Sequence, residues 1–190
     1  MNTLIKPYRP NPKTVIIIII VSLLIPLGLG IFILGKNLAI NNDYPAQIYT
    51  LKDAMADGYL SGKGIKPVQD IKDIVKKSDC FIETANIQVQ DSAVKVTVAK
   101  SFFGSIKNGE TITINMSEDM QKTPLRFDNV DGALLLLSSD NSNFVLSDGY
   151  SDIFYIKNDK IYPANDVTDV YRKYIGQSKV KFTELVSSKK

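Results

Sequence analysis

The chemistry open to this chain is limited first by the absence of histidine from all 190 residues. Ser-His-Asp and Cys-His mechanisms are excluded, as are zinc sites that need a histidine ligand. The single cysteine, Cys80, has no second cysteine for a disulfide within the chain, and its position before an apolar segment is typical of a small buried residue. A serine activated by a lysine is the nucleophile that remains.

Two short segments resemble motifs of penicillin-recognising enzymes. Ser92 and Lys95 match S-x-x-K, and Ser139 opens an S-D-N sequence. Those enzymes place S-x-x-K at the start of a helix, whereas alternating valines predict that Lys95 lies in a strand. The nearest equivalent of K-T-G, at residues 122–124, precedes S-D-N instead of following it. The context therefore argues against this class.

Two other hydrolase hypotheses have weaker patterns. Bacterial signal peptidases join an N-terminal span to a β-rich exported domain, and residues 139–150 (SDNSNFVLSDGY) resemble their Gly-Asp-Asn-rich box. The Ser-Met-x-Pro segment and the box arginines of that family are missing. Paired carboxylates for glycoside hydrolysis, such as Glu118 with Asp119 or Asp128 with Asp131, fit solvated turns better. An exported hydrolase of the Ser-Lys or paired-carboxylate type is thus the alternative to a non-enzymatic function.

Tyrosines offer a contact surface instead of chemistry. Six aromatic residues fall between positions 150 and 174, and tyrosine buries a large area at little entropic cost. Tyr150, Tyr155 and Tyr162 are the interface candidates, although packing in the core explains such residues more simply. The sequence predicts no catalytic residue, no cofactor and no metal ligand.

The elements that position these residues begin with an apolar segment. In residues 15–34 only Ser22, Pro26, Gly28 and Gly30 are not Val, Ile, Leu or Phe. A helix of this length would extend about 30 Å, the thickness of the hydrocarbon core of a bilayer. The segment predicts a transmembrane helix over residues 15–34, preceded by a cytoplasmic tail of residues 1–14.

A cleaved signal peptide is the alternative to a retained anchor. Pro26 breaks the helix, and the small residues Gly28 and Gly30 would provide a cleavage site after Gly30. The apolar run continues through residues 31–34, which makes it longer than a usual signal peptide core. A retained anchor is preferred, and the remainder of the chain is exported in either case.

Charge predicts the orientation of the span. Lys6, Arg9 and Lys13 precede the span, and no acidic residue occurs before Asp43, so the positive-inside rule places the N-terminus in the cytoplasm. Four of the 23 basic residues lie at or before Lys36, which leaves 19 against 20 acidic residues outside. No basic cluster for nucleic acid stands out. The predicted partners are membrane lipid through residues 15–34 and an envelope protein, with no nucleic acid.

The exported part begins with helical signals. Residues 35–66 predict a stem helix and a linker, in which the helix runs from Asp43 and Pro45 to Gly58. A second helix begins near Pro67. The tail of the chain returns to helix, first from Asn165 or Asp166 to Gly176 and then in a short final turn.

Between these helices the pattern is that of strands. From residue 80 onward apolar residues alternate with polar ones, and Lys107–Glu110 contains the Asn-Gly of a hairpin turn. Residues 133–137 are continuously apolar, which predicts a central strand covered on both faces. Short connections favour antiparallel pairing. The predicted fold is α+β: an N-terminal transmembrane helix, then a small antiparallel β-sheet or partly closed barrel flanked by helices, in a domain of residues 67–190.

The strand rhythm of FDNVDGALLLLSS (127–139) and GYSDIFYIKNDKIYP (149–163) resembles small single-pass envelope proteins of low-GC Gram-positive bacteria with a β-rich exported domain. The resemblance implies a bacterial cell membrane location with the C-terminal domain outside. The expected function is a membrane-anchored extracytoplasmic domain of non-enzymatic binding or scaffolding type. A membrane-complex subunit that acts chiefly through its span is a further alternative.

Overall fold

The computed structural model describes residues 44–45, 48–59, 70–123, 125–140 and 143–190. The predicted transmembrane helix and the linker around residues 61–64 lie outside the described residues. The chain divides into two compact units, residues 1–42 and 43–190, and the description that follows concerns the second. None of the helices in the described ranges has the length and apolar character needed to cross a bilayer.

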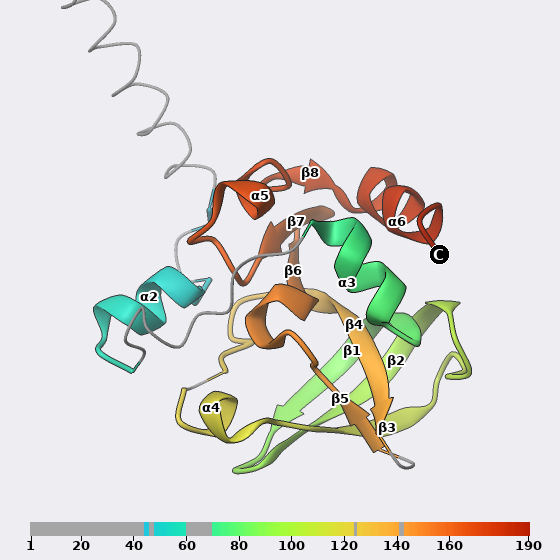
Figure 1. Cartoon of the computed structure of the whole chain (residues 1–190), viewed down its shortest axis with the longest axis horizontal. Helices are drawn as coiled ribbons and strands as arrows, with labels where there is room; N and C mark the ends of the chain where they lie inside the picture. The colour runs from blue at the N-terminus through green and yellow to red at the C-terminus, as the bar shows by residue number, and fades with distance from the viewer. Residues whose placement is uncertain (1–43, 46–47, 60–69, 124, 141–142) are drawn as a thin grey trace, which may run out of the picture. The chain divides into compact units, whose positions relative to one another are not determined.

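The strands of the described part join in a single sheet (Figure 1). Their bounds are β1 Cys80–Val89, β2 Ala93–Phe103, β3 Thr111–Asn115, β4 Gly132–Asp140, β5 Asn143–Val145, β6 Ile153–Lys157, β7 Lys160–Pro163 and β8 Gln177–Ser178. The order is β1-β2-β3-β5-β4-β6-β7-β8, and an additional β1–β4 pairing closes the first five strands into a barrel. The prediction of a β-rich α+β fold is confirmed. Antiparallel pairing, which the short connections favour, is found between all paired strands of the described sheet except β3 and β5, which pair in parallel.

The helices are short. Their bounds are α2 Leu51–Ala56, α3 Ile71–Lys77, α4 Glu118–Gln121, the 3₁₀ helix η2 Gly149–Asp152, α5 Asp169–Arg172 and α6 Lys179–Ser187. The stem helix α2 starts at Leu51 and not at the predicted Asp43, because Thr50 and Asp53 form a reciprocal capping box at its N-terminus. The predicted helix before Gly176 is reduced to the four residues of α5.

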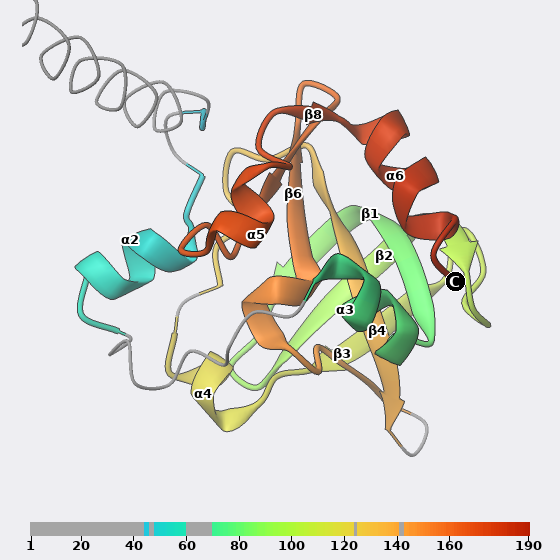
Figure 2. The same ribbon diagram turned by 45° about the horizontal axis from the view of Figure 1, so that its top comes forward.

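Strand β4 runs between two hydrophobic clusters. Ala133, Leu135 and Leu137 point into the barrel interior, whereas Leu134 and Leu136 point to a second cluster under α3 and α6. Helices α3 and α6 lie side by side over this second face (Figure 2). The prediction that β4 is covered on both faces is confirmed.

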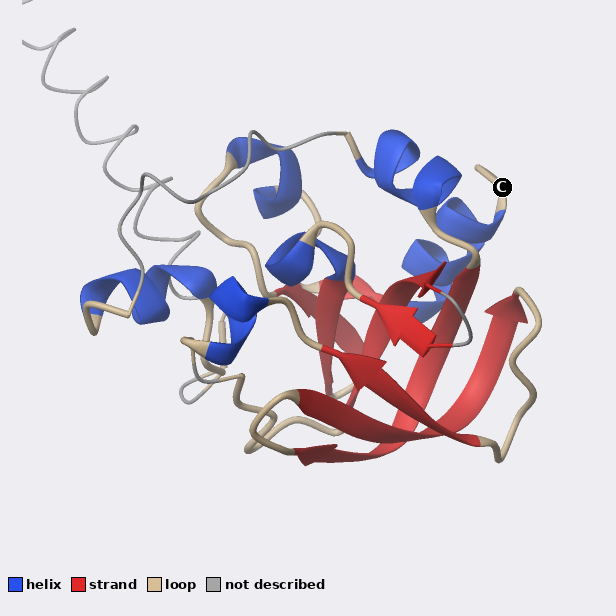
Figure 3. Cartoon of the chain, turned by 60° about the horizontal axis from the view of Figure 1, so that its bottom comes forward, coloured by secondary structure: helices blue, strands red, loops and turns tan. Residues whose placement is uncertain are grey.

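In the described part of the chain, the outer face is open to solvent over β3, the first half of β2 and the second half of β1, whereas α6 and its cluster cover the start of β1 and the end of β2. Figure 3 shows the helices gathered on one side of the strands. The residues of β3 alternate between exposed and buried, and β2 alternates in the same way over its first half. The exposed face of β1, β2 and β3 is therefore where a ligand can approach the barrel.

Candidate functional site

A polar groove of about 210 Å³ lies on the outer face of the barrel, where β1, β2 and β3 are neighbours. Its lining residues are Asn86 and Gln88 of β1, Lys95 and Thr97 of β2, and Thr111 of β3. Four of these side chains are exposed and that of Thr97 is partly buried. The lining residues come from three strands that are separated by turns, so they lie close together only when the sheet has formed.

A β-bulge in β1 turns the two carboxamide residues outward. Ala85 has no cross-strand partner on β2, whereas Thr84 and Asn86 on either side of it are both paired. Because the extra residue reverses the alternation of the strand, Thr84 is buried before the bulge, and Asn86 and Gln88 face solvent after it. Ile87 then packs against the barrel interior.

Regular alternation places the remaining groove residues. The valines of β2 and the isoleucines of β3 are buried, so the residues between them point away from the core. Thr97 lies opposite Thr111, with 3.4 Å between their hydroxyl oxygens. Lys95 lies opposite Gln88. The period-two pattern of the sequence identifies these residues as outward-facing, but it gives no signal that they enclose a groove.

The groove is suited to recognition through hydrogen bonds. Carboxamides and hydroxyls donate and accept, and the ammonium group of Lys95 donates and carries a positive charge. No carboxylate, thiol or aromatic ring is among the residues that line it. No cluster of potential ligand residues that could hold a metal ion occurs in the described ranges. The arrangement can bind a polar ligand.

The three tyrosines predicted as interface candidates lie in the core. Tyr150, Tyr155 and Tyr162 have relative exposures of 7%, 0% and 6%. Burial raises the pKa of the Tyr155 hydroxyl far above its ordinary value, and the same cause raises that of Tyr150. Because their rings contribute to the barrel interior, these side chains present almost no surface to a partner.

The structure does not assemble the Ser-Lys motifs. Ser92 is exposed in the turn after β1, and its carbonyl oxygen accepts a hydrogen bond from the backbone N–H of Met116. Lys95 points into the groove, and no hydrogen bond joins it to Ser92 in the described part of the chain. Ser139 belongs to β4, which is not a neighbour of β2 in the sheet, and its backbone N–H donates to Asp79. Asn141 lies outside the described residues.

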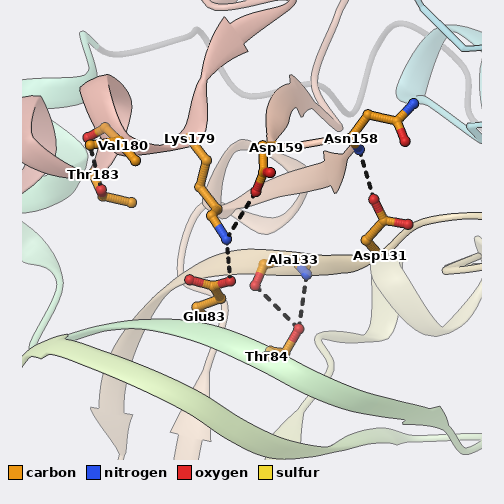
Figure 4. A network of polar contacts seen from close by, with 9 residues as sticks. All are labelled: Glu83, Thr84, Asp131, Ala133, Asn158, Asp159, Lys179, Val180 and Thr183. Atoms are coloured by element: carbon orange, nitrogen blue, oxygen red, sulfur yellow. Dashed lines mark hydrogen bonds and ion pairs between the residues drawn. The ribbon is translucent and has the colours of Figure 1, made fainter.

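Three of the four acidic candidates, Glu118, Asp119 and Asp131, have structural roles in the described part of the chain. Glu118 and Asp119 occupy the first turn of α4, where the helix dipole favours negative charge. Asp131 accepts a hydrogen bond of 2.7 Å from the backbone N–H of Asn158, which lowers the pKa of its carboxyl group (Figure 4). Lys157 lies 3.5 Å from the same carboxylate. Through these two contacts Asp131, just before β4, binds the end of β6 and the turn between β6 and β7.

A polar network beside the groove-forming bulge joins the C-terminal elements to the barrel (Figure 4). The ammonium group of Lys179, at the start of α6, lies 2.8 Å from Glu83 of β1 and 3.6 Å from Asp159. The hydrogen bond to Glu83 raises the pKa of Lys179. On the next residue of β1, the Thr84 hydroxyl accepts from the Ala133 N–H at 2.9 Å and donates to the Ala133 carbonyl at 3.2 Å.

The order β1-β2-β3-β5-β4, closed by the β1–β4 pairing, is the connectivity of an OB-type barrel, a five-stranded Greek-key fold. The described domain is thus an OB-type barrel whose sheet continues through β6, β7 and β8, with a polar groove on its outer face. No protein-family model and no curated protein matches the chain.

Proposed function

We propose that this chain is a single-pass membrane protein of the bacterial cell envelope whose exported barrel binds another envelope component without catalysing a reaction. The apolar residues 15–34 and the basic residues before them support the anchor and its orientation. In this proposal the N-terminus is cytoplasmic, residues 15–34 contact membrane lipid, and the barrel of residues 80–145 presents its groove outside the cell.

The observation that carries the binding function is the polar groove across β1, β2 and β3. In other OB-type barrels the face formed by the second and third strands binds oligosaccharides and oligonucleotides. That comparison is an analogy between folds, because unrelated functions share this architecture. The argument from the residues themselves is that five hydrogen-bonding side chains converge on one open groove.

The hydrolase alternative has no specific support from the geometry. A Ser-Lys mechanism needs the lysine within hydrogen-bond reach of the serine hydroxyl. Lys95 instead lies beside Gln88 and Thr97, which belong to the groove. A binding role for Lys95 accounts for its position with no further assumption.

The anchor and its orientation are tested with alkaline phosphatase, which is active only after export, fused behind Lys190. We expect activity from the full-chain fusion and none from a control fusion that lacks residues 1–36. An inactive full-chain fusion, together with activity of a cytoplasmic reporter at the same site, would refute the proposed location. The N-terminal sequence of the mature protein distinguishes the retained anchor from cleavage after Gly30.

The binding role is tested by co-sedimentation of the full chain, in an uncharged detergent, with insoluble envelope material from the bacterium that encodes it. The double variant Asn86→Ala/Gln88→Ala removes two hydrogen-bonding groups, so we expect affinity to fall by about fivefold or more. Gln90→Ala is the matched control, because Gln90 is an exposed carboxamide just beyond β1 and outside the groove lining. Equal retention of the double variant and the control would contradict the assignment of the groove.

A further inference from the structure

Lys95 is the only charged residue among the side chains that line the groove. Its side chain is exposed, and its ammonium group forms no ion pair with any residue that the structure describes. Lys157 and Lys179, by comparison, pair with carboxylates of the same domain. The charge of Lys95 is therefore available to an anionic group of a ligand.

Neutral hydrogen-bonding groups surround this charge in two rows across the strands. Gln88 lies opposite Lys95 in one row, and Asn86 lies opposite Thr97, which lies opposite Thr111, in the other. Adjacent strands are about 4.8 Å apart, and residues on one face of a strand repeat at about 6.7 Å. Such spacing matches a ligand with closely spaced hydroxyl groups, because carboxamides and hydroxyls donate and accept at every position.

The lining also disfavours other kinds of ligand. Single-stranded nucleic acid is usually bound by bases stacking on aromatic rings, and the groove lining has no aromatic ring. A lipid tail or an apolar peptide needs an apolar lining, which the five polar side chains do not provide. The groove of about 210 Å³ is smaller than the roughly 300–1,000 Å³ of pockets that enclose a whole drug-sized molecule, so it fits one segment of a longer chain.

We propose that the groove binds a segment of a sugar chain that carries carboxylate groups. The carboxamides of Asn86 and Gln88 and the hydroxyls of Thr97 and Thr111 bond the sugar hydroxyls, and Lys95 bonds one carboxylate. This inference rests on the proposed binding function, and it names the class of ligand that the groove selects.

The test measures binding of three probes to the full chain in an uncharged detergent by isothermal titration calorimetry. The probes are a galacturonic acid hexamer, the uncharged maltohexaose and a deoxythymidine hexamer. We expect the galacturonic acid hexamer to bind most tightly. Lys95→Gln should weaken it by about tenfold, the effect of losing a hydrogen bond between charged groups, so that the acidic hexamer loses its advantage over maltohexaose.

Matched variants separate the specific contact from general attraction. Lys72→Gln removes the same charge from an exposed position on α3 and should leave the affinity for the acidic hexamer unchanged. Lys95→Arg keeps the charge and should retain most of the binding. Thr111→Val should weaken binding, because it removes a hydroxyl group that lines the groove.

Three results would overturn the ligand class: no binding of the galacturonic acid hexamer, equal binding of maltohexaose or of the deoxythymidine hexamer, or equal effects of Lys95→Gln and Lys72→Gln. These results leave the co-sedimentation experiment with Asn86→Ala/Gln88→Ala independent. If that double variant still loses retention on envelope material, the groove binds a ligand of another class. If it does not, the proposed function fails as well.

Discussion

Replacement of Thr84 by valine tests how the barrel is closed next to the groove. Thr84 is 2% exposed, and its hydroxyl bonds both the N–H and the carbonyl of Ala133. In a regular antiparallel ladder a backbone residue of β1 would serve this role. The ladder between β1 and β4 ends at Glu83 and Leu134, so at the next position the Thr84 side chain takes the place of the backbone.

The magnitude follows from the two backbone groups that would lose their partner. Valine has nearly the same shape as threonine, so Thr84→Val creates no sizeable cavity. A buried polar group without a partner costs about 1–3 kcal/mol, which gives about 2–6 kcal/mol for the N–H and carbonyl of Ala133. At about 3 °C for each kcal/mol in a domain of this size, the midpoint of thermal unfolding should fall by about 6–18 °C.

The assay is thermal unfolding followed by circular dichroism, with Thr84→Ser as the control. Serine keeps the hydroxyl and loses only a methyl group, so its effect should be about 1 kcal/mol. If Thr84→Val destabilises the protein no more than Thr84→Ser does, the hydroxyl does not replace the backbone ladder. The explanation of barrel closure at Thr84 would then be wrong.

Three further perturbations test other parts of the fold. Gly104→Ala should destabilise the protein by about 2–5 kcal/mol in chemical denaturation. Gly104 has φ +104°, and a Cβ there would lie 2.5 Å from the sulfur of Cys80. An unchanged unfolding midpoint would contradict this packing. Lys179→Met should cost about 1 kcal/mol by removing the ion pair with Glu83. Because the folded-state pKa of Lys179 is raised, the stability difference between the variant and the wild type should persist below pH 10.5 and disappear as the pH rises further. A pH-independent difference would exclude the ion pair as its cause. The raised pKa of Tyr155 predicts that stability falls above pH 10, where only the unfolded chain ionises this hydroxyl. Tyrosinate absorbance should then rise together with the loss of circular dichroism. Ionisation of Tyr155 before unfolding would argue against its burial.

Strand β4 could be predicted from the sequence because burial on both faces removes every polar position from residues 133–137. The hairpin between β2 and β3 was equally readable, since Gly109 adopts the positive φ that the turn requires. Both signals are local: the residues that give them also form the element. The parallel pairing of β3 with β5 depends on closure of the whole barrel, and no local pattern contains that information.

The start of α2 shows why a local signal can mislead. Pro45 is typical of a first helical turn, but the helix starts at Leu51. The backbone N–H of Leu51 donates to the carbonyl of Ala164, and that of Lys52 donates to Asp166. These partners are more than a hundred residues away in the sequence, so the N-terminus of this helix is set by tertiary contacts.

The candidate site was predictable only in part. The alternating valines predict that Lys95 lies in a strand, but the polar side of a strand usually has no further role. The bulge at Ala85, which brings Asn86 and Gln88 to the same face, has no glycine or proline to mark it. The tyrosines, by contrast, stand out in the sequence by their size and spacing, but the fold buries them.

Because both faces of β4 are buried, the barrel and the C-terminal sheet form one cooperative folding unit. A fragment that stops after Val145 would keep all five barrel strands, yet it would expose Leu134 and Leu136 to water. The amides of β1 and β6, which flank β4 on its two edges, should therefore exchange with solvent at the same free energy of opening. Dissection of this molecule into a minimal barrel and a removable extension would fail for that reason.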